Sequence, residues 1–207
     1  MKDTVERLTP MGVMVLALLR EGDMHPYEMV RLMRTRHGSR LLTITNGTLY
    51  HSVSRLQQSE LIEEVGVARA GNRPERTTYA LTAAGSDALL EWVRQELPRV
   101  DRPERFRIAV VESHNLDATE VLALLRERRG ALVSEQAAHQ DRLATGRANG
   151  VPEQFLLDVE RQAQLLAADL RWLDTLIERL YADAIPWGSA GFDDSDRYVA
   201  QRKAARQ

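Results

Sequence analysis

Hydroxyl, amide and guanidinium groups gather in the stretch from Thr45 to Leu81. Small polar residues come first, and they are Thr45, Asn46, Gly47 and Thr48. If a helix begins here, its free N–H groups and its dipole favour a phosphate at this end. Arginines follow at Arg55, Arg69, Arg73 and Arg76. Guanidinium, hydroxyl and backbone N–H groups hold phosphates, so the stretch is suited to a phosphate-rich partner.

A short helix must position the first of these groups. Thr45 suits the N-cap, and apolar residues then recur at helical spacing, at Leu49, Val53 and Leu56. This spacing places Thr48, His51 and Arg55 together on another face. A helix with small polar groups and one arginine on its outward face is suited to lie in a groove.

Two strands follow the helix. Residues 62–67 have the apolar pattern of a strand, and residues 77–81 alternate as a returning strand, with A-G-N-R-P between them as the turn. That turn would project Arg69, Arg73 and Arg76 beside the helix. A helix followed by a two-stranded wing predicts a winged-helix reading head.

Two further helices precede this unit. Pro10 suits the first turn of a helix that ends near Gly22, and Pro26 begins a second helix that breaks at residues 37–39. The order is therefore helix, helix, helix, strand, strand. The alternative is a small helical core with a hairpin, in which the apolar face simply packs and the outward face has no role.

Composition bounds the class of protein. The chain has 207 residues, 43% of them hydrophobic, and no cysteine, which excludes disulfides, a thiolate nucleophile and Cys-ligated zinc. No secretory pattern and no apolar run long enough to cross a bilayer is present. We expect a cytoplasmic, soluble protein.

The charge of the chain is polarised locally. The net charge of −2 argues against indiscriminate coating of nucleic acid. Residues 1–82 contain 11 Lys and Arg against 9 Asp and Glu, and the segment 31–55 carries five arginines and no acid. Positive charge is therefore concentrated on the predicted reading head.

The second half of the sequence is almost all helical. After a helix that includes Trp92, Pro98 and Pro103 bracket a linker, and helices are predicted near residues 106–111, 119–145 and 152–181. The last carries a heptad seam of Val159, Ala163, Leu166, Leu170, Leu173, Ile177 and Leu180. An internal two-helix hairpin could cover this seam. We favour a second subunit, because two-fold symmetry helps a reader of duplex DNA.

Enzymatic interpretations find little support. Glu112, His114, Asp117 and Glu120 can be drawn as a metal cluster, but Asp117 is explained as a helix cap or first-turn acid. No phosphate-cradling loop or dinucleotide fingerprint occurs. We therefore expect no enzyme activity, no metal and no cofactor.

The first half of the sequence contains several spaced motifs, which are H-P-Y-E at 25–28, G-T-L-Y at 47–50, R-L at 55–56, L-I at 61–62, G-N-R-P-E-R at 71–76 and Y-A-L-T-A-A-G at 79–85. Together they resemble the PadR-like family of transcriptional regulators, in which His-Gly-Tyr-Glu corresponds to H-P-Y-E. The resemblance covers about residues 10–97. Pro26 stands where the family commonly has Gly, and His51 stands where it commonly has Pro. A non-proline residue at position 51 leaves a side chain free to contact DNA.

The resemblance implies contacts with double-stranded operator DNA. The candidate residues are Thr45, Asn46, Gly47, Thr48, Tyr50, His51, Arg55, Arg69, Asn72, Arg73 and Arg76. Tyr50 would contact a phosphate or would instead be an aromatic residue at the edge of the core. Arg55 would contact a phosphate or a guanine edge, or would be a solvated surface residue. For Arg69, Asn72, Arg73 and Arg76, the alternative is an ordinary charged hairpin that does not contact DNA.

The predicted protein is mainly α, with an N-terminal winged helix-turn-helix of three helices plus a two-stranded wing. We divide it into a DNA-binding domain at 1–84, a connecting helix and linker at 85–103, a helical dimerisation domain at 104–184 and a poorly ordered tail at 185–207.

The resemblance also implies a mode of regulation. Members with a long helical C-terminal domain, the Vir-like subgroup, dimerise through it, and family repressors are released by small hydrophobic or aromatic ligands. Trp92 and Trp172 are the candidates for stacking such a ligand, although both could be core residues. The expected function is a homodimeric repressor. The alternative is a winged-helix adaptor that binds proteins and not specific DNA.

Overall fold

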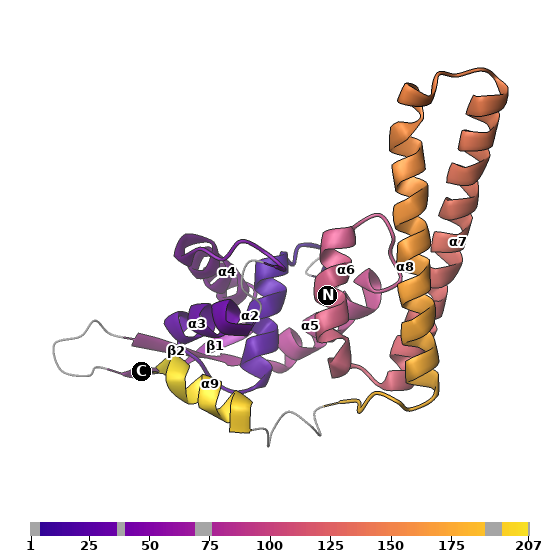
Figure 1. The fold of residues 1–207 in the computed structure, drawn as a ribbon. Coiled ribbons are helices and arrows are strands. Elements are labelled where there is room, and N and C mark those ends of the chain that lie inside the picture. The colour runs from indigo at the N-terminus through magenta and orange to yellow at the C-terminus, as the bar shows by residue number, and fades with distance from the viewer. Residues whose placement is uncertain (1–4, 37–39, 69–75, 189–195, 207) are drawn as a thin grey trace.

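The computed structural model describes residues 5–36, 40–68, 76–188 and 196–206. It is mainly helical, with one two-stranded sheet, and a long helical hairpin projects from a compact head (Figure 1). The elements are α2 Pro10–Arg20, α3 Pro26–Arg36, α4 Asn46–Gln58, β1 Ile62–Ala68, β2 Arg76–Leu81, α5 Ala83–Glu96, α6 Pro103–Glu112, η1 Ser113–Asn115, α7 Ala118–Ala148, η2 Glu153–Phe155, α8 Leu157–Tyr181 and α9 Asp196–Arg206.

The head has the predicted order of three helices followed by two strands. Thr9 caps α2 by accepting a hydrogen bond from the Gly12 N–H at 3.1 Å, and Pro10 occupies its first turn. After α2, Gly22 adopts a φ of 130°, a conformation that glycine reaches without steric cost. The apolar faces of α2, α3 and α4 pack into one core.

The wing strands pair antiparallel, with Ile62 opposite Leu81. A register shift between Glu64 and Gly66 bulges β1. On its other edge, β2 pairs with the α2–α3 connection, because Met24 and Tyr79 exchange two backbone hydrogen bonds of 3.0 Å. The base of the wing is therefore tied to the helical core, and its tip, residues 69–75, lies outside the described residues.

Helix α5 joins the head to the rest of the chain. Thr82 caps it and also donates its hydroxyl to the Glu60 carbonyl at 2.8 Å. Gly85 faces the end of α4 so closely that a Cβ there would lie 2.0 Å from the Leu61 carbonyl oxygen. The glycine of the Y-A-L-T-A-A-G motif thus permits the close approach of α5 to the turn that joins α4 to β1.

One continuous core runs from the head through α5 and α6 to the base of the α7–α8 hairpin. Trp92 on α5, Ile108 on α6, Leu125 on α7 and Leu173 on α8 are all buried in it. No break in this core separates the head from the helices that follow, within the residues described.

The heptad seam of α8 faces α7 of the same chain. Ala163, Leu166, Leu170, Leu173 and Leu180 are buried, and Arg129 on α7 bonds Asp174 on α8 at 2.5 Å. The seam that we assigned to a second subunit is therefore covered by an internal hairpin. The reason is geometric, since the short connection through η2 returns α8 antiparallel to α7 (Figure 1).

The C-terminal tail also differs from expectation. Residues 196–206 form helix α9, which packs on α3 of the head (Figure 1). Arg206 pairs with the buried carboxylate of Glu28 at 3.1 Å, and Ala205 is buried against the head. A polar composition suggested disorder, but these long-range contacts give the segment a docked position.

None of the helices in the described ranges is long and apolar enough to cross a membrane.

Candidate nucleic-acid interface

The amino end of α4 is built by a reciprocal cap. Thr45 accepts the Thr48 N–H at 3.1 Å, and the Thr48 hydroxyl accepts the Thr45 N–H at 3.3 Å. Leu49 donates its N–H to the Thr45 carbonyl. The N–H groups of Asn46 and Gly47 lie in the first turn, where no carbonyl precedes them in the helix. They point outward at the positive end of the helix dipole.

The outward face of α4 carries the residues expected from the sequence. Leu49, Val53 and Leu56 are buried, so the opposite side of the helix is left to solvent. Exposed on it are Thr45, Asn46, Gly47, Thr48, Tyr50, His51, Ser54 and Arg55. The structure brings these predicted residues together on one continuous helical surface.

Helix α4 ends in a tight reversal. Glu60 adopts a φ of 57°, its N–H bonds the Gln57 carbonyl at 2.9 Å, and the Leu61 N–H bonds the Leu56 carbonyl at 3.0 Å. Leu61 is thereby turned into the core. On the surface side, the Gln57 amide donates to Glu64 of β1 at 2.8 Å, which couples the helix to the wing.

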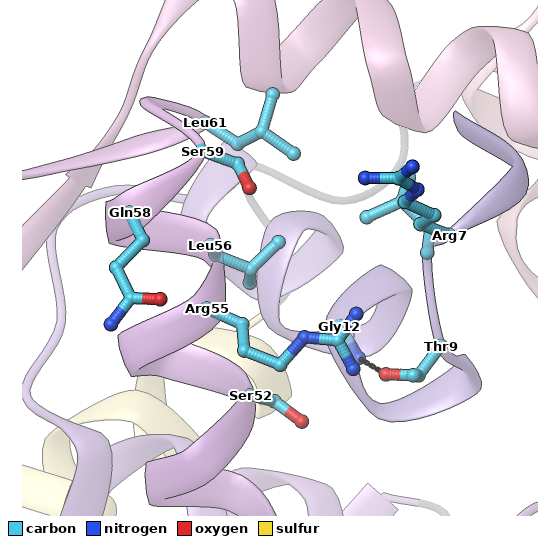
Figure 2. A pocket seen from close by; sticks show the side chains of 10 residues that line it. Arg7, Thr9, Gly12, Ser52, Arg55, Leu56, Gln58, Ser59 and Leu61 are labelled. Atoms are coloured by element: carbon cyan, nitrogen blue, oxygen red, sulfur yellow. Dashed lines mark hydrogen bonds between the residues drawn. The ribbon is translucent and has the colours of Figure 1, made fainter. Parts of the chain in front are cut away.

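A polar pocket lies between the start of α2 and the second half of α4. Its volume is about 270 Å³, and its lining residues are Arg7, Leu8, Thr9, Gly12, Ser52, Arg55, Leu56, Gln58, Ser59 and Leu61. Figure 2 shows Arg55 reaching from α4 toward Thr9 and Gly12, with Arg7 on the far side of the pocket from Gln58. No acidic and no aromatic residue is among the lining residues.

Sequence reasoning did not single out Arg7, Thr9 or Ser59. Arg7 lies far from Arg55 in sequence, so no local spacing connects them. The only sequence signal is that Arg7 is a basic residue just before a Thr-Pro helix start. The juxtaposition comes from the packing of α2 against α4.

The positive charge of the head is partly neutralised. Arg36, in the acid-free segment of the sequence, forms a two-pronged ion pair with Glu21, and its Nη2 lies 2.9 Å from Oε2 of that residue. Its Nε donates to Gln201 of α9 at 3.3 Å. Arg31 instead stacks over the Tyr27 ring at 5.8 Å. Acids that are distant in sequence thus reach some of these arginines.

The wing residues are only partly described. Arg76 begins β2, opposite Ala68, whereas Arg69, Asn72 and Arg73 lie outside the described residues. Tyr79 lies deeper in the wing, where burial first, and then the negative charge of Glu64, raise the pKa of its hydroxyl.

The two tryptophans named as ligand candidates have different surroundings. Trp92 is 1% exposed in the core, which favours its alternative role as a packing residue. Trp172 is 46% exposed and meets Phe106 edge to face at 6.2 Å. The guanidinium of buried Arg128 stacks 3.5 Å from the centre of the Phe106 ring and donates to the Arg99 carbonyl.

Glu112 and Asp117 belong to the acidic and histidine residues that the sequence places near the start of α7. Across the described ranges, no group of three or more His, Asp or Glu side chains is arranged to hold a metal ion. Asp117 is at the N-cap position of α7 without a side-chain cap bond. Glu112 is buried, and its Oε2 accepts from the Asn115 amide at 3.1 Å. Burial raises the pKa of this carboxyl to about 7.

One family model matches part of the chain. The model of the transcriptional regulator PadR-like family matches residues 15–91, which include α2 through most of α5. No protein with a curated description matches the chain significantly.

A search of solved structures found several partial similarities to this chain. Bacillus subtilis PadR in complex with operator DNA is 17% identical, with 82% of this chain and 98% of that chain covered and a TM-score of 0.38. The protein smu.1604c from Streptococcus mutans UA159 is 17% identical, with coverage of 81% and 98% and a TM-score of 0.37. Bacillus subtilis PadR in complex with p-coumaric acid is 18% identical, with coverage of 84% and 98% and a TM-score of 0.34.

Proposed function

We propose that this chain is a PadR-like transcriptional regulator that binds double-stranded operator DNA in a sequence-specific manner, a proposal supported by the match of the family model to residues 15–91. The single observation that carries the proposal is the outward face of α4. Its polar residues are exposed while its apolar residues are buried, and residues 45–48 at its capped amino end are exposed. A helix presented in this way can enter the major groove.

The proposal assigns different tasks to different residues. The N–H groups of Asn46 and Gly47 bind a phosphate at the positive end of the helix, and Tyr50 donates its hydroxyl to another. His51 and Thr48 reach base edges. His51 is exposed beside Tyr50, and its ring nitrogens can donate to or accept from a base. Arg73 of the wing adds a salt-dependent contact to the backbone.

We further propose that two copies act together as a homodimeric repressor. The seam of α8 is occupied inside the chain, so the contact would use the outer face of the hairpin. Leu157, Leu165 and Trp172 recur there at helical spacing and are 60%, 44% and 46% exposed. Val133 on α7 is 42% exposed as well. Burying these side chains against a second copy would also fix the spacing between two reading heads.

We also propose that a small aromatic effector binds at the base of the hairpin and releases the DNA. Trp172, Phe106 and Arg128 place two aromatic rings and one buried guanidinium at the base of the hairpin, where α6, α7 and α8 meet. Burial lowers the pKa of Arg128, which indicates a costly charge in this position. A planar ligand with a carboxylate would match both features. Quenching of tryptophan fluorescence by phenolic acids, lost in Trp172→Phe and accompanied by loss of DNA binding, tests this part.

The experiment for DNA binding uses the full chain and the DNA upstream of its own reading frame. We expect a sequence-specific mobility shift, tighter than that of a scrambled duplex of the same length and composition. His51→Ala should change the ratio of affinities for variant operators by about tenfold, because one base contact contributes about 1–3 kcal/mol of discrimination.

The adaptor alternative predicts a different result. An adaptor would bind both duplexes weakly and equally, and raising the salt concentration would abolish both complexes. Equal binding of the upstream and scrambled duplexes by the wild-type chain would refute the proposed function. A matched control is His139→Ala on α7, far from the head, which should leave the affinity ratio unchanged.

A further inference from the structure

Two arginines from distant parts of the sequence line one pocket beside the recognition helix (Figure 2). We propose that the pocket between Arg7 and Arg55 binds a phosphate of the DNA backbone, and that Arg7 is a DNA contact. The inference rests on the proposed function, because it assumes a duplex against α4. It assigns Arg55 to a phosphate and not to a guanine edge.

The charges around the pocket favour the binding of an anion. Several arginines of the described chain form ion pairs with a carboxylate, as Arg94 does with Glu120 at 2.6 Å and Arg129 does with Asp174 at 2.5 Å. In the described ranges neither Arg7 nor Arg55 forms an ion pair, and no acid lines the pocket. Two guanidinium groups that face one small space repel each other unless an anion lies between them. Phosphate oxygens accept their N–H groups with short, charge-assisted hydrogen bonds.

The start of α2 adds to the positive potential. Gly12, in the first turn of α2, lines the pocket, so the positive end of the helix dipole faces the same space. The Ser59 hydroxyl lies on the opposite wall as a further donor. The Ser52 hydroxyl already donates to the Thr48 carbonyl, whereas the Thr9 hydroxyl accepts the Gly12 N–H and keeps its own hydrogen as a donor. The two arginines therefore provide most of the free donors.

The geometry favours a duplex phosphate over a free nucleotide. No aromatic side chain lines the pocket, so a nucleobase would find no surface on which to stack. Arg55 lies one helical turn after His51, on the helix that would occupy the groove. Its side chain turns along the protein surface toward Thr9 instead of following the outward direction of α4 (Figure 2). A strand that borders the groove would pass over this pocket.

Salt-dependent binding tests the inference directly. Each neutralised phosphate contributes about 0.9 to the slope of log K against log salt concentration. We expect Arg7→Gln and Arg55→Gln each to lower the slope, and the double variant to lower it by about one unit, because both arginines neutralise the same phosphate. The ratio of affinities for the operator and the scrambled duplex should stay the same. Arg142→Gln, an exposed arginine on the distant part of α7, is the matched control and should leave the slope unchanged.

The outcomes separate the inference from the proposed function. If the wild-type chain binds the operator specifically and Arg7→Gln keeps the full slope, the inference is wrong and the function stands. A change in base preference with Arg55→Gln would make Arg55 a base reader and overturn the assignment. Failure of the wild-type chain to prefer the operator would refute the proposed function itself.

A second measurement separates the duplex from a free anion. Inorganic phosphate, added at constant ionic strength, should not raise the thermal midpoint of the wild-type chain. A rise that disappears in the Arg7→Gln, Arg55→Gln double variant would identify a free-phosphate site and overturn the assignment to the DNA backbone. Circular dichroism of each variant verifies folding, which we expect to be retained because both side chains are exposed.

Discussion

Replacing Glu112 with glutamine should make the stability of this protein less sensitive to pH. Glu112 ends α6 with its side chain 6% exposed, and the Asn115 amide is its hydrogen-bond donor among the described residues. Burial raises its pKa to about 7, the negative charge of Glu21 adds to this, and Arg36 and Arg20 oppose it. Glutamine keeps an oxygen that can accept from Asn115 but cannot ionise.

The pKa values set the sign and the size of the effect. The folded carboxyl, with a pKa of about 7, holds its proton more tightly than the unfolded carboxyl, with its ordinary value of 4.5. Between these values the folded state binds more protons, so the free energy of unfolding falls as the pH rises. Each pKa unit corresponds to about 1.4 kcal/mol, so the loss from pH 5 to pH 8 is about 2–3 kcal/mol. Most of this loss of unfolding free energy occurs below pH 7.

Urea unfolding at fixed protein concentration measures this effect. The free energy of unfolding of Glu112→Gln minus that of the wild type should increase by about 2–3 kcal/mol between pH 5 and pH 8. Other titrating groups are common to both proteins, so their contributions cancel in the difference. Parallel pH profiles, with a constant offset between the two proteins, would refute the reasoning, because Glu112 would then titrate alike in both states.

Two further substitutions test the packing of the head. Gly85→Ala should lower the free energy of unfolding by about 1–3 kcal/mol in a thermal scan, because the added Cβ would lie 2.0 Å from the Leu61 carbonyl oxygen. The matched control is Gly130→Ala, which has open space around it and should be neutral or stabilising in the same scan. Arg206→Ala should lower the free energy of unfolding by about 1–2 kcal/mol, because the buried Glu28 carboxylate loses its ion pair. Adding Glu28→Gln should recover most of this free energy. Equal losses of stability in the single and double variants would contradict the pairing.

Local features of the head followed closely from the sequence. Thr45 as N-cap of α4, the Pro10 and Pro26 helix starts and the two wing strands were all predicted, and the structure confirms them. These features depend on neighbouring residues, through backbone conformation and the period of apolar positions. The motif match likewise uses local order, and the family model agrees with it over residues 15–91.

Two predictions that depended on contacts between distant segments differ from the structure. The seam of α8 indicated a buried face but did not say what buries it, and α7 of the same chain covers it. The tail had the composition of a disordered segment, yet α9 docks on the head through Arg206 and Ala205. Amphipathic spacing predicts that one face of a helix is buried. Which segment packs on that face depends on where the chain reverses and on ion pairs between residues distant in sequence.

The sequence by itself determined the type and order of the elements, the cap of α4 and the polar face that this helix presents. Tertiary packing alone decided that Arg7 meets Arg55 across one pocket, that Glu112 loses its solvent and that Gly85 must lack a side chain. The physical reason is range. Capping and amphipathicity act over one or two helical turns, whereas desolvation, like-charge proximity and close backbone approach arise only when segments distant in sequence are brought together.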